Sequence, residues 1–242
     1  MTLRTYAIGD IHGQIDLLHA AHALIAADRA RVGDAEPPVV HVGDLVDRGP
    51  ESRGVVDLLL KGQLSGQPWV VLKGNHDRMF TLFLDGKHDP ILRADLDYLN
   101  PRIGGGTTLA SYGAAPDASP AEASAAVPQG HRAFLADLPG YCLRGEVLFV
   151  HAGVRPGVAL EHQIEDDLSW IRGPFLEFTA PHPWLVIHGH TNIDAPTHYG
   201  NRVNIDSGAA YGGPLTTIVV EGRDVFVLTP SGRVALPAPG TA

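Results

Sequence analysis

Residues 70–77 read VVLKGNHD, an apolar run that ends at a glycine and is followed directly by Asn75, His76 and Asp77. The apolar residues predict a buried strand, and Gly74 permits a sharp turn at its end. Gly-Asn is common turn chemistry, so one interpretation is a plain turn. The other is that this strand presents an amide, an imidazole and a carboxylate to a functional site.

Strand and helix patterns alternate around this motif. Strands are predicted at 5–10, 37–44 and 68–74, and helices at 15–30, 51–62 and 76–86. This order predicts an α/β fold with parallel strands covered by helices. Later strands are predicted at 145–154, 183–191, 201–209, 215–222 and 224–230. The close spacing of the last four favours antiparallel pairing among them.

The middle of the chain, about 87–145, has a different composition. Segments 89–100 and 130–142 look helical, whereas 111–130 is rich in Ala, Ser, Pro and Gly and is predicted to be an exposed loop. No linker marks a domain boundary. We therefore expect a single domain over residues 1–242, with 87–145 as a helical cap over one side of a cleft.

Composition restricts the function. The 242 residues carry a formal net charge of −9, which argues against nucleic acid or an anionic membrane as a partner. Cys142 is the single cysteine, so no internal disulfide can form. The first residues show no signal-peptide pattern, and no apolar run has the length of a membrane span. These features predict a soluble, cytoplasmic protein.

Five predicted strands end in polar residues with a neighbouring glycine. These ends are GDIHG (9–13), GDLVDRG (43–49), GNHD (74–77), HAG (151–153) and HGHT (188–191). Ligands of open α/β sheets bind beyond the carboxyl ends of the strands. If the strands are neighbours, one cluster forms from Asp10, His12, Asp44, Asn75, His151 and His190.

This cluster has the chemistry of a metal site. Two carboxylates, three imidazoles and one amide oxygen suit manganese, iron or zinc and not calcium. Six ligands fit two divalent ions that share a carboxylate, about 3.5–4 Å apart. The two ions would outweigh the two carboxylates and attract an anionic substrate. Asn75 supplies an oxygen without cancelling that charge.

The ordered motifs GDIHG, GDLVDRG, GNHD, HAG and GHT resemble the PPP family of metal-dependent protein phosphatases, within the calcineurin-like metallophosphoesterases. HRAFLADLP, LFVHAGVRPG, DLSWIRGPF and NRVNIDSGAAYGG extend the resemblance to the small bacterial serine/threonine phosphatases. The resemblance implies a β-sandwich flanked by helices, in α/β/β/α layers.

The resemblance also implies residue roles. Asp10 and His12 would bind the first metal, Asp44 both metals, and Asn75, His151 and His190 the second. His76 would be the general acid, oriented by Asp47, and Arg48 and Arg172 would bind phosphate. The implied reaction is in-line attack by a metal-bridging hydroxide on phosphoserine or phosphothreonine, and by extension phosphotyrosine, in a phosphoprotein or phosphopeptide. Manganese is the preferred metal, with iron and zinc as alternatives.

Two departures from related patterns bear on this interpretation. Asp77 stands where the family often has Glu, and we expect little effect because this position is not a ligand. The ending His190-Thr191-Asn192 lacks the second histidine of the GHxH pattern found in many phosphodiesterases, which favours the PPP branch. His41 and His188 are interpreted as structural histidines.

Two alternatives remain open. A symmetrical dinucleoside tetraphosphate hydrolase would have a similar fold, although that group usually has Gln at the position of His12. A non-catalytic phosphate-binding protein on the same fold is the other alternative, and such a protein would be expected to have lost some of the ligands.

Overall fold

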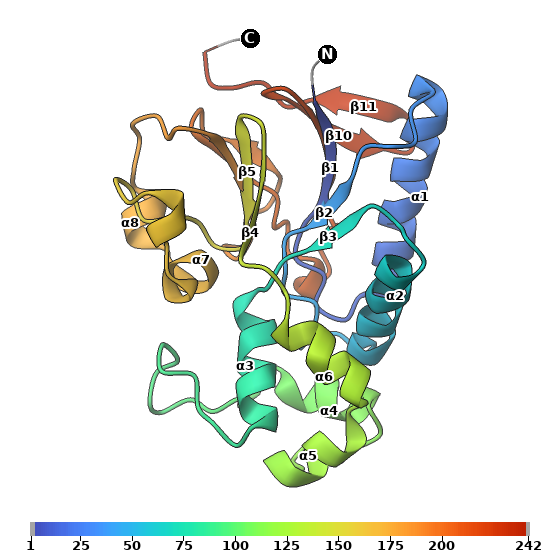
Figure 1. Ribbon diagram of the computed structural model, residues 1–242, viewed down its shortest axis with the longest axis vertical. Coiled ribbons are helices and arrows are strands. Elements are labelled where there is room, and N and C mark those ends of the chain that lie inside the picture. The colour runs from blue at the N-terminus through green and yellow to red at the C-terminus, as the bar shows by residue number, and fades with distance from the viewer. Residues whose placement is uncertain (1–2, 241–242) are drawn as a thin grey trace.

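The computed structural model describes residues 3–240 and contains two β-sheets flanked by helices (Figure 1). The six-stranded sheet has the order β11-β10-β9-β1-β2-β3, and the five-stranded sheet has the order β4-β5-β6-β8-β7. The strands of the first sheet are β1 (Arg4–Ile8), β2 (Val39–His41), β3 (Trp69–Val71), β9 (Thr217–Glu221), β10 (Asp224–Thr229) and β11 (Gly232–Ala235). Those of the second are β4 (Tyr141–Arg144), β5 (Val147–Val150), β6 (Leu185–His188), β7 (Thr197–His198) and β8 (Arg202–Asn204).

The helices lie outside the pair of sheets and at one end of it. Those of the first half are α1 (Ile15–Val32), α2 (Ser52–Leu64) and α3 (Asn75–Leu84). The middle of the chain forms α4 (Gly105–Ser111), α5 (Pro120–Ala126) and α6 (Gln129–Ala136). The second half adds α7 (Glu165–Trp170), α8 (Gly173–Leu176) and the short 3₁₀ segments η1 (Leu160–His162) and η2 (Ala209–Tyr211).

Alternating side chains build the layers. In β5, Val147 and Phe149 belong to the core between the sheets, whereas Leu148 and Val150 belong to the core beneath α7 and α8. In β1, Ala7 faces the other sheet, while Tyr6 packs in the core that contains α1 and α2. Strand side chains point alternately to opposite faces, so one strand contributes to two cores. This confirms the α/β/β/α layers that the resemblance implied.

Strand pairing departs from the expectation in the second half of the chain. β1, β2 and β3 pair in parallel as predicted, and β9 and β10 pair antiparallel as predicted. β5, β6 and β8 are parallel instead, because the chain crosses over between them through α7, α8 and the loop that carries β7. The prediction of antiparallel pairing for the strands of the last third was therefore wrong for β6 and β8.

The middle segment also differs from its prediction in three places. The helix expected over 130–142 ends at Ala136, and residues 141–142 already belong to β4. Residues 89–100 form turns and no helix, although a helix was expected there. Residues 111–130 include α5, whose Ala123 is fully buried, although an exposed loop was expected. Figure 1 shows α4, α5 and α6 gathered beside α3, at the end of the molecule opposite the two chain termini. The division of residues 1–242 into one domain with a cap stays a prediction.

The parallel strands of both sheets end on the side of the molecule where α3 begins. β3 leads directly into α3, and β1 and β2 run parallel to it. The fold therefore gathers the loops after several strands at one edge. No helix within residues 3–240 is both long and apolar enough to cross a membrane.

Candidate metal centre

The site residues predicted from the sequence lie at strand ends of both sheets. Asp10 and His12 follow β1, Asp44 follows β2, and Asn75 begins α3 just after β3. His151 and His190 follow β5 and β6 of the other sheet. All six are buried, with exposed fractions of 8 % or less. The site therefore lies where the two sheets meet at their shared edge.

Asp44 lies between two groups of potential ligands. Its Oδ2 is 3.3 Å from His12 Nε2, and its Oδ1 is 3.3 Å from His151 Nε2. One group with ligand atoms close enough to hold a metal ion is His12, Asp44 and His76, and the other is Asp44, His151 and His190. A carboxylate common to two groups is the arrangement that a two-ion site requires.

The second group contains a converging amide oxygen. Asn75 Oδ1 lies 3.0 Å from His151 Nε2 and 2.8 Å from His190 Nδ1. His151 Nδ1 lies 3.0 Å from the carbonyl oxygen of Val42, which can accept its proton and leave Nε2 with a free lone pair. The predicted second-metal ligands are thus together, and His151 has its ligating nitrogen directed to the others.

The first group is less complete. His12 Nδ1 lies 2.9 Å from the carbonyl oxygen of Val46, so Nε2 can face Asp44 as a ligand atom. Asp10 does not belong to the close group, and its Oδ2 accepts the backbone N–H of His190 at 2.9 Å. Its Oδ1 is buried and has no hydrogen-bond partner within the described chain. His76 takes the third place in this group, although it was predicted to be the general acid.

The electrostatics suit bound cations. Burial, and then the carboxylates of Asp206 and Asp44, raise the pKa of Asp10 well above its usual value. For Asp44, burial alone would raise the pKa. The imidazoles of His151 and His76 have the larger combined effect and hold the pKa of Asp44 well below its usual value. An unpartnered carboxylate oxygen beside other buried carboxylates is unfavourable without positive charge. The residues present therefore fit divalent ions.

His76 and Asp47 form the predicted pair. His76 Nδ1 lies 2.7 Å from Asp47 Oδ2, which leaves Nε2 as the nitrogen available for chemistry. The backbone N–H of His76 donates to Asp44 Oδ1 at 3.0 Å, so the pair is joined to the predicted metal ligands. Burial lowers the pKa of His76, although the Asp44 and Asp47 carboxylates oppose this effect.

The two predicted phosphate-binding arginines differ in position. Arg48 lies in the cluster, where its Nη1 is 2.7 Å from His12 Nε2 and its guanidinium is 5.1 Å from the centre of the Tyr211 ring. Arg172 is exposed and precedes α8. Its charge contributes to the lowered pKa of His190, after burial and His151. The structure thus brings Arg48 into the site and leaves Arg172 at its rim.

Sequence reasoning assigned no role in the site to four residues around the cluster: Asp206, Asp77, Tyr98 and Thr108. Asp206 is buried and follows β8, a sixth strand end at which a polar residue follows an apolar one with a glycine, Gly208, nearby. Asp77 accepts the backbone N–H groups of Leu45 and Gly74, both at 2.9 Å, and so joins the loops after β2 and β3. Tyr98 and Thr108 donate to Asp47, and nothing in their local sequence signals this.

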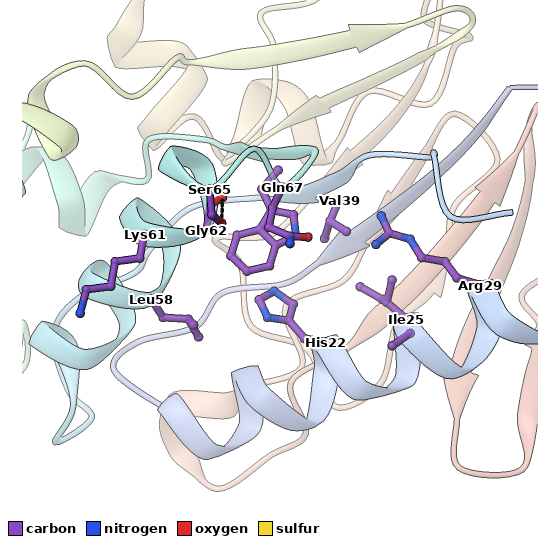
Figure 2. A pocket seen from close by; sticks show the side chains of 11 residues that line it. His22, Ile25, Arg29, Val39, Leu58, Lys61, Gly62, Ser65 and Gln67 are labelled. Carbon is purple, nitrogen blue, oxygen red and sulfur yellow. Dashed lines mark hydrogen bonds between the residues drawn. The ribbon is translucent and has the colours of Figure 1, made fainter.

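One sizeable cavity of the protein lies away from this site. A cavity of about 510 Å³ lies between α1, α2 and β3, and Figure 2 shows its lining side chains, among them His22, Arg29 and Lys61. It contains none of the predicted site residues. His22 at its wall lies 2.9 Å, Nε2 to Nε2, from His41, which is fully buried, as is His188. The burial of both residues, and the contact of His41 with His22, agree with structural roles for His41 and His188.

Comparisons with known proteins agree on the family. The profile described as calcineurin-like phosphoesterase matches residues 3–214. The chain is 26 % identical over 231 residues to the asymmetrical bis(5'-nucleosyl)-tetraphosphatase PrpE of Anoxybacillus flavithermus, covering 87 % of this chain and 88 % of that protein. It is 24 % identical over 229 residues to the protein of the same name from Bacillus mycoides, covering 86 % and 87 %.

Solved structures show the same fold. A protein assigned as a diadenosine tetraphosphatase superposes with a TM-score of 0.64 at 22 % identity, covering 99 % of this chain and 96 % of that one. A cold-active protein-tyrosine phosphatase of a psychrophilic Shewanella superposes with a TM-score of 0.62 at 16 % identity, covering 98 % and 81 %. The matched profile spans most of the chain, and the fold and the clustered ligands agree with it, so this chain belongs to the calcineurin-like phosphoesterase family.

Proposed function

We propose that this phosphoesterase hydrolyses dinucleoside tetraphosphates, with asymmetrical cleavage, at a centre of two divalent ions. The observation that carries the proposal is the buried Asp44 carboxylate between two groups of ligand atoms, with Arg48 beside them. The curated relatives named for this reaction support the substrate class, since they align over nearly their whole length. His12 stands where symmetrical dinucleoside tetraphosphate hydrolases usually have Gln, but we give the names of these relatives more weight. The names also favour asymmetrical over symmetrical cleavage.

In this proposal the ligands keep the assignment that the family resemblance implied. Asp10 and His12 hold one ion, Asn75, His151 and His190 hold the other, and Asp44 binds both. When bound, two such ions polarise phosphoryl oxygens and activate water for attack. Manganese is the proposed metal, with iron and zinc as alternatives, because imidazole and carboxylate ligands suit all three.

The remaining residues handle the substrate. Arg48 binds a phosphate next to His12, because a planar guanidinium pairs with two phosphate oxygens at once. Arg172 at the rim attracts the polyphosphate chain. His76 holds a proton on Nε2 for the leaving oxygen, and Asp47 fixes the ring through Nδ1.

A phosphoserine or phosphothreonine phosphatase is the second candidate. The observation in its favour is the His76–Asp47 pair. An alkoxide leaving group needs a proton more than a nucleotide leaving group does, because the nucleotide oxygen is far less basic. A proton donor positioned this well suits phosphomonoesters of serine, threonine or tyrosine.

One set of assays separates the candidates. Metal-stripped protein is reloaded with manganese, zinc, iron or magnesium and given a dinucleoside tetraphosphate, a phosphoserine peptide or a phosphotyrosine peptide. We expect metal-dependent release of a nucleoside triphosphate and a monophosphate from the dinucleotide, resolved by ion-exchange chromatography. Two diphosphates would indicate symmetrical cleavage. Turnover of peptides alone would favour the second candidate.

A matched variant tests the centre itself. Asp44→Asn keeps the shape of the side chain and removes the shared charge, so activity should fall to background together with metal content. Asp85→Asn, at an exposed carboxylate just after α3, is the control and should retain both. Tight binding of substrate by metal-loaded protein without turnover would instead indicate a phosphate-binding protein.

A further inference from the structure

We propose that Tyr98 and Thr108 are positioning residues that hold the Asp47 carboxylate in place for His76. This inference rests on the proposed role of His76 as proton donor. Both residues belong to the middle segment of the chain, for which the sequence predicted only a cap.

The Asp47 carboxylate uses its two oxygens for different partners. Oδ1 accepts a hydrogen bond from the Tyr98 hydroxyl at 2.5 Å and another from Thr108 Oγ1 at 2.8 Å. Oδ2 faces His76 Nδ1 at 2.7 Å. Two donors on one oxygen prevent rotation of the carboxylate, so Oδ2 stays directed to the imidazole.

Thr108 has every hydrogen-bonding position occupied. Its hydroxyl donates to Asp47 Oδ1 and accepts the backbone N–H of Asp47 at 2.8 Å. Ser52 Oγ lies 3.0 Å from the same hydroxyl and can donate to its second lone pair. Asp47 has φ of 72°, a left-handed conformation that a non-glycine residue adopts only when its surroundings hold it there. Thr108 contacts both the backbone and the carboxylate of this residue.

Tyr98 is fixed by packing. It is 5 % exposed, its ring stacks on Phe80 at 5.7 Å between ring centres, and it contacts Phe83 at 4.9 Å. Gly105 leaves room for it, because a Cβ there would lie 2.5 Å from the Tyr98 ring. Burial, and then the Asp47 charge, raise the pKa of Tyr98 well above its usual value, so the phenol keeps the proton that it donates.

These contacts give the middle segment a second role. Asp47 lies in the loop after β2, whereas Tyr98 and Thr108 lie in the turns before α4 and in α4 itself. The pair that orients the proton donor is therefore completed only when this segment packs against the sheet. Hydrogen bonds to a charged carboxylate are stronger than neutral ones, so their loss should be measurable in turnover.

The test compares two aryl phosphates that differ in their need for a proton. The variants Tyr98→Phe and Thr108→Val are assayed with manganese on both substrates. Phenyl phosphate has a basic leaving group that needs a proton, whereas the leaving group of p-nitrophenyl phosphate departs without a proton. We expect kcat on phenyl phosphate to fall about tenfold, the equivalent of one lost charge-assisted hydrogen bond. kcat on p-nitrophenyl phosphate and KM for both substrates should stay within about twofold, since ground-state binding is unchanged.

Two further variants serve as controls for this test. Tyr112→Phe is the matched control, since it removes a buried tyrosine hydroxyl of the same segment that pairs with His131 and not with Asp47. It should leave both rates unchanged. The double variant His76→Asn with Tyr98→Phe should lose no more activity than His76→Asn alone, because Tyr98 acts through His76.

Equal loss on both aryl phosphates, or a further loss in the double variant, would overturn the inference. These assays do not depend on the natural substrate, so failure of the dinucleotide assignment is recognised separately, from the products of the dinucleotide assay. A fall in thermal stability without a change in leaving-group preference would assign Tyr98 a purely structural role and would also contradict the proposal.

Discussion

At the scale of single residues, the site is marked by its backbone conformation. Five non-glycine residues of the described chain have positive φ, and every one is a predicted site residue: His12, Asp44, Asp47, Arg48 and His190. Such conformations are uncommon and cost free energy unless the surroundings impose them. The sequence indicated His12, Asp44 and His190 by type and spacing, and Asp47 and Arg48 through the family resemblance. No sequence pattern indicated that their backbones are strained. Strand ends therefore supply both the ligands and the sharp turns that aim them.

A glycine next to this cluster gives the first prediction at this scale. A Cβ on Gly189 would overlap the Asp10 carboxylate, which is buried and bound to the backbone of His190. Gly189→Ala should therefore displace Asp10 and weaken manganese binding about tenfold or more, as changes around metal ligands commonly do. Calorimetric titration of the metal-stripped variant measures this, with circular dichroism to verify the fold.

Gly54→Ala is the matched control for this substitution. Gly54 lies in α2, where the nearest atom to a new Cβ is 3.5 Å away, an ordinary contact. Alanine also favours helix over glycine. We expect unchanged metal affinity there, and unchanged affinity in Gly189→Ala would show that Asp10 is not a ligand.

At the scale of elements, local patterns predicted the first half of the chain well. β1, α1, β2, α2, β3 and α3 all lie where the alternation placed them, because the strands are short apolar runs, the helices have helical spacing, and each element ends near a glycine. The helix predicted for residues 89–100 was wrong because side-chain contacts override the local helix propensity there. Asp89 bonds to Arg78 and to the Trp170 indole N–H, contacts that no local pattern contains. The local sequence likewise did not show that β5 pairs with β6, or that β6 pairs with β8, because these strands are far apart in the chain.

α5 was missed although its start is readable in the sequence. Ser119, Pro120 and Glu122 form a capping box with proline in the first turn, a pattern that the Ala- and Pro-rich composition concealed. Ser119→Ala should therefore lower the free energy of unfolding by about 1 kcal/mol. Urea denaturation followed by circular dichroism measures this.

The conservative variant Ser119→Asp controls for this prediction, because aspartate is an equally good helix N-cap. It should retain the stability of the unchanged protein. If alanine and aspartate gave the same stability as serine, α5 would contribute nothing to the fold, and the exposed loop expected from composition would be the better description.

At the scale of the whole molecule, the site joins two sheets that the sequence keeps apart. Asp44 and Asn75 come from loops of the six-stranded sheet, and His151 and His190 from loops of the five-stranded sheet. The sequence predicted that these residues meet, because parallel strands end at one edge of a sheet. The strand-end pattern did not show that these residues come from two different sheets. How the two sheets pack face to face depends on the core between them. Ions bound here would cross-link the two layers.

Metal should therefore stabilise the fold as well as serve the reaction. An ion that binds only the folded chain adds about 4 kcal/mol when its concentration is a thousandfold above Kd. We expect manganese to raise the free energy of unfolding of metal-stripped protein by this amount. The urea midpoint should rise accordingly, with the denaturant slope unchanged.

His151→Asn removes a proposed ligand supplied by the second sheet. It should abolish most of this gain in free energy of unfolding, whatever it does to the metal-free protein. His162→Asn, at an exposed histidine, should keep the increment in full. An equal increment in both variants would mean that manganese acts elsewhere, and that the edge shared by the two sheets is not where it binds.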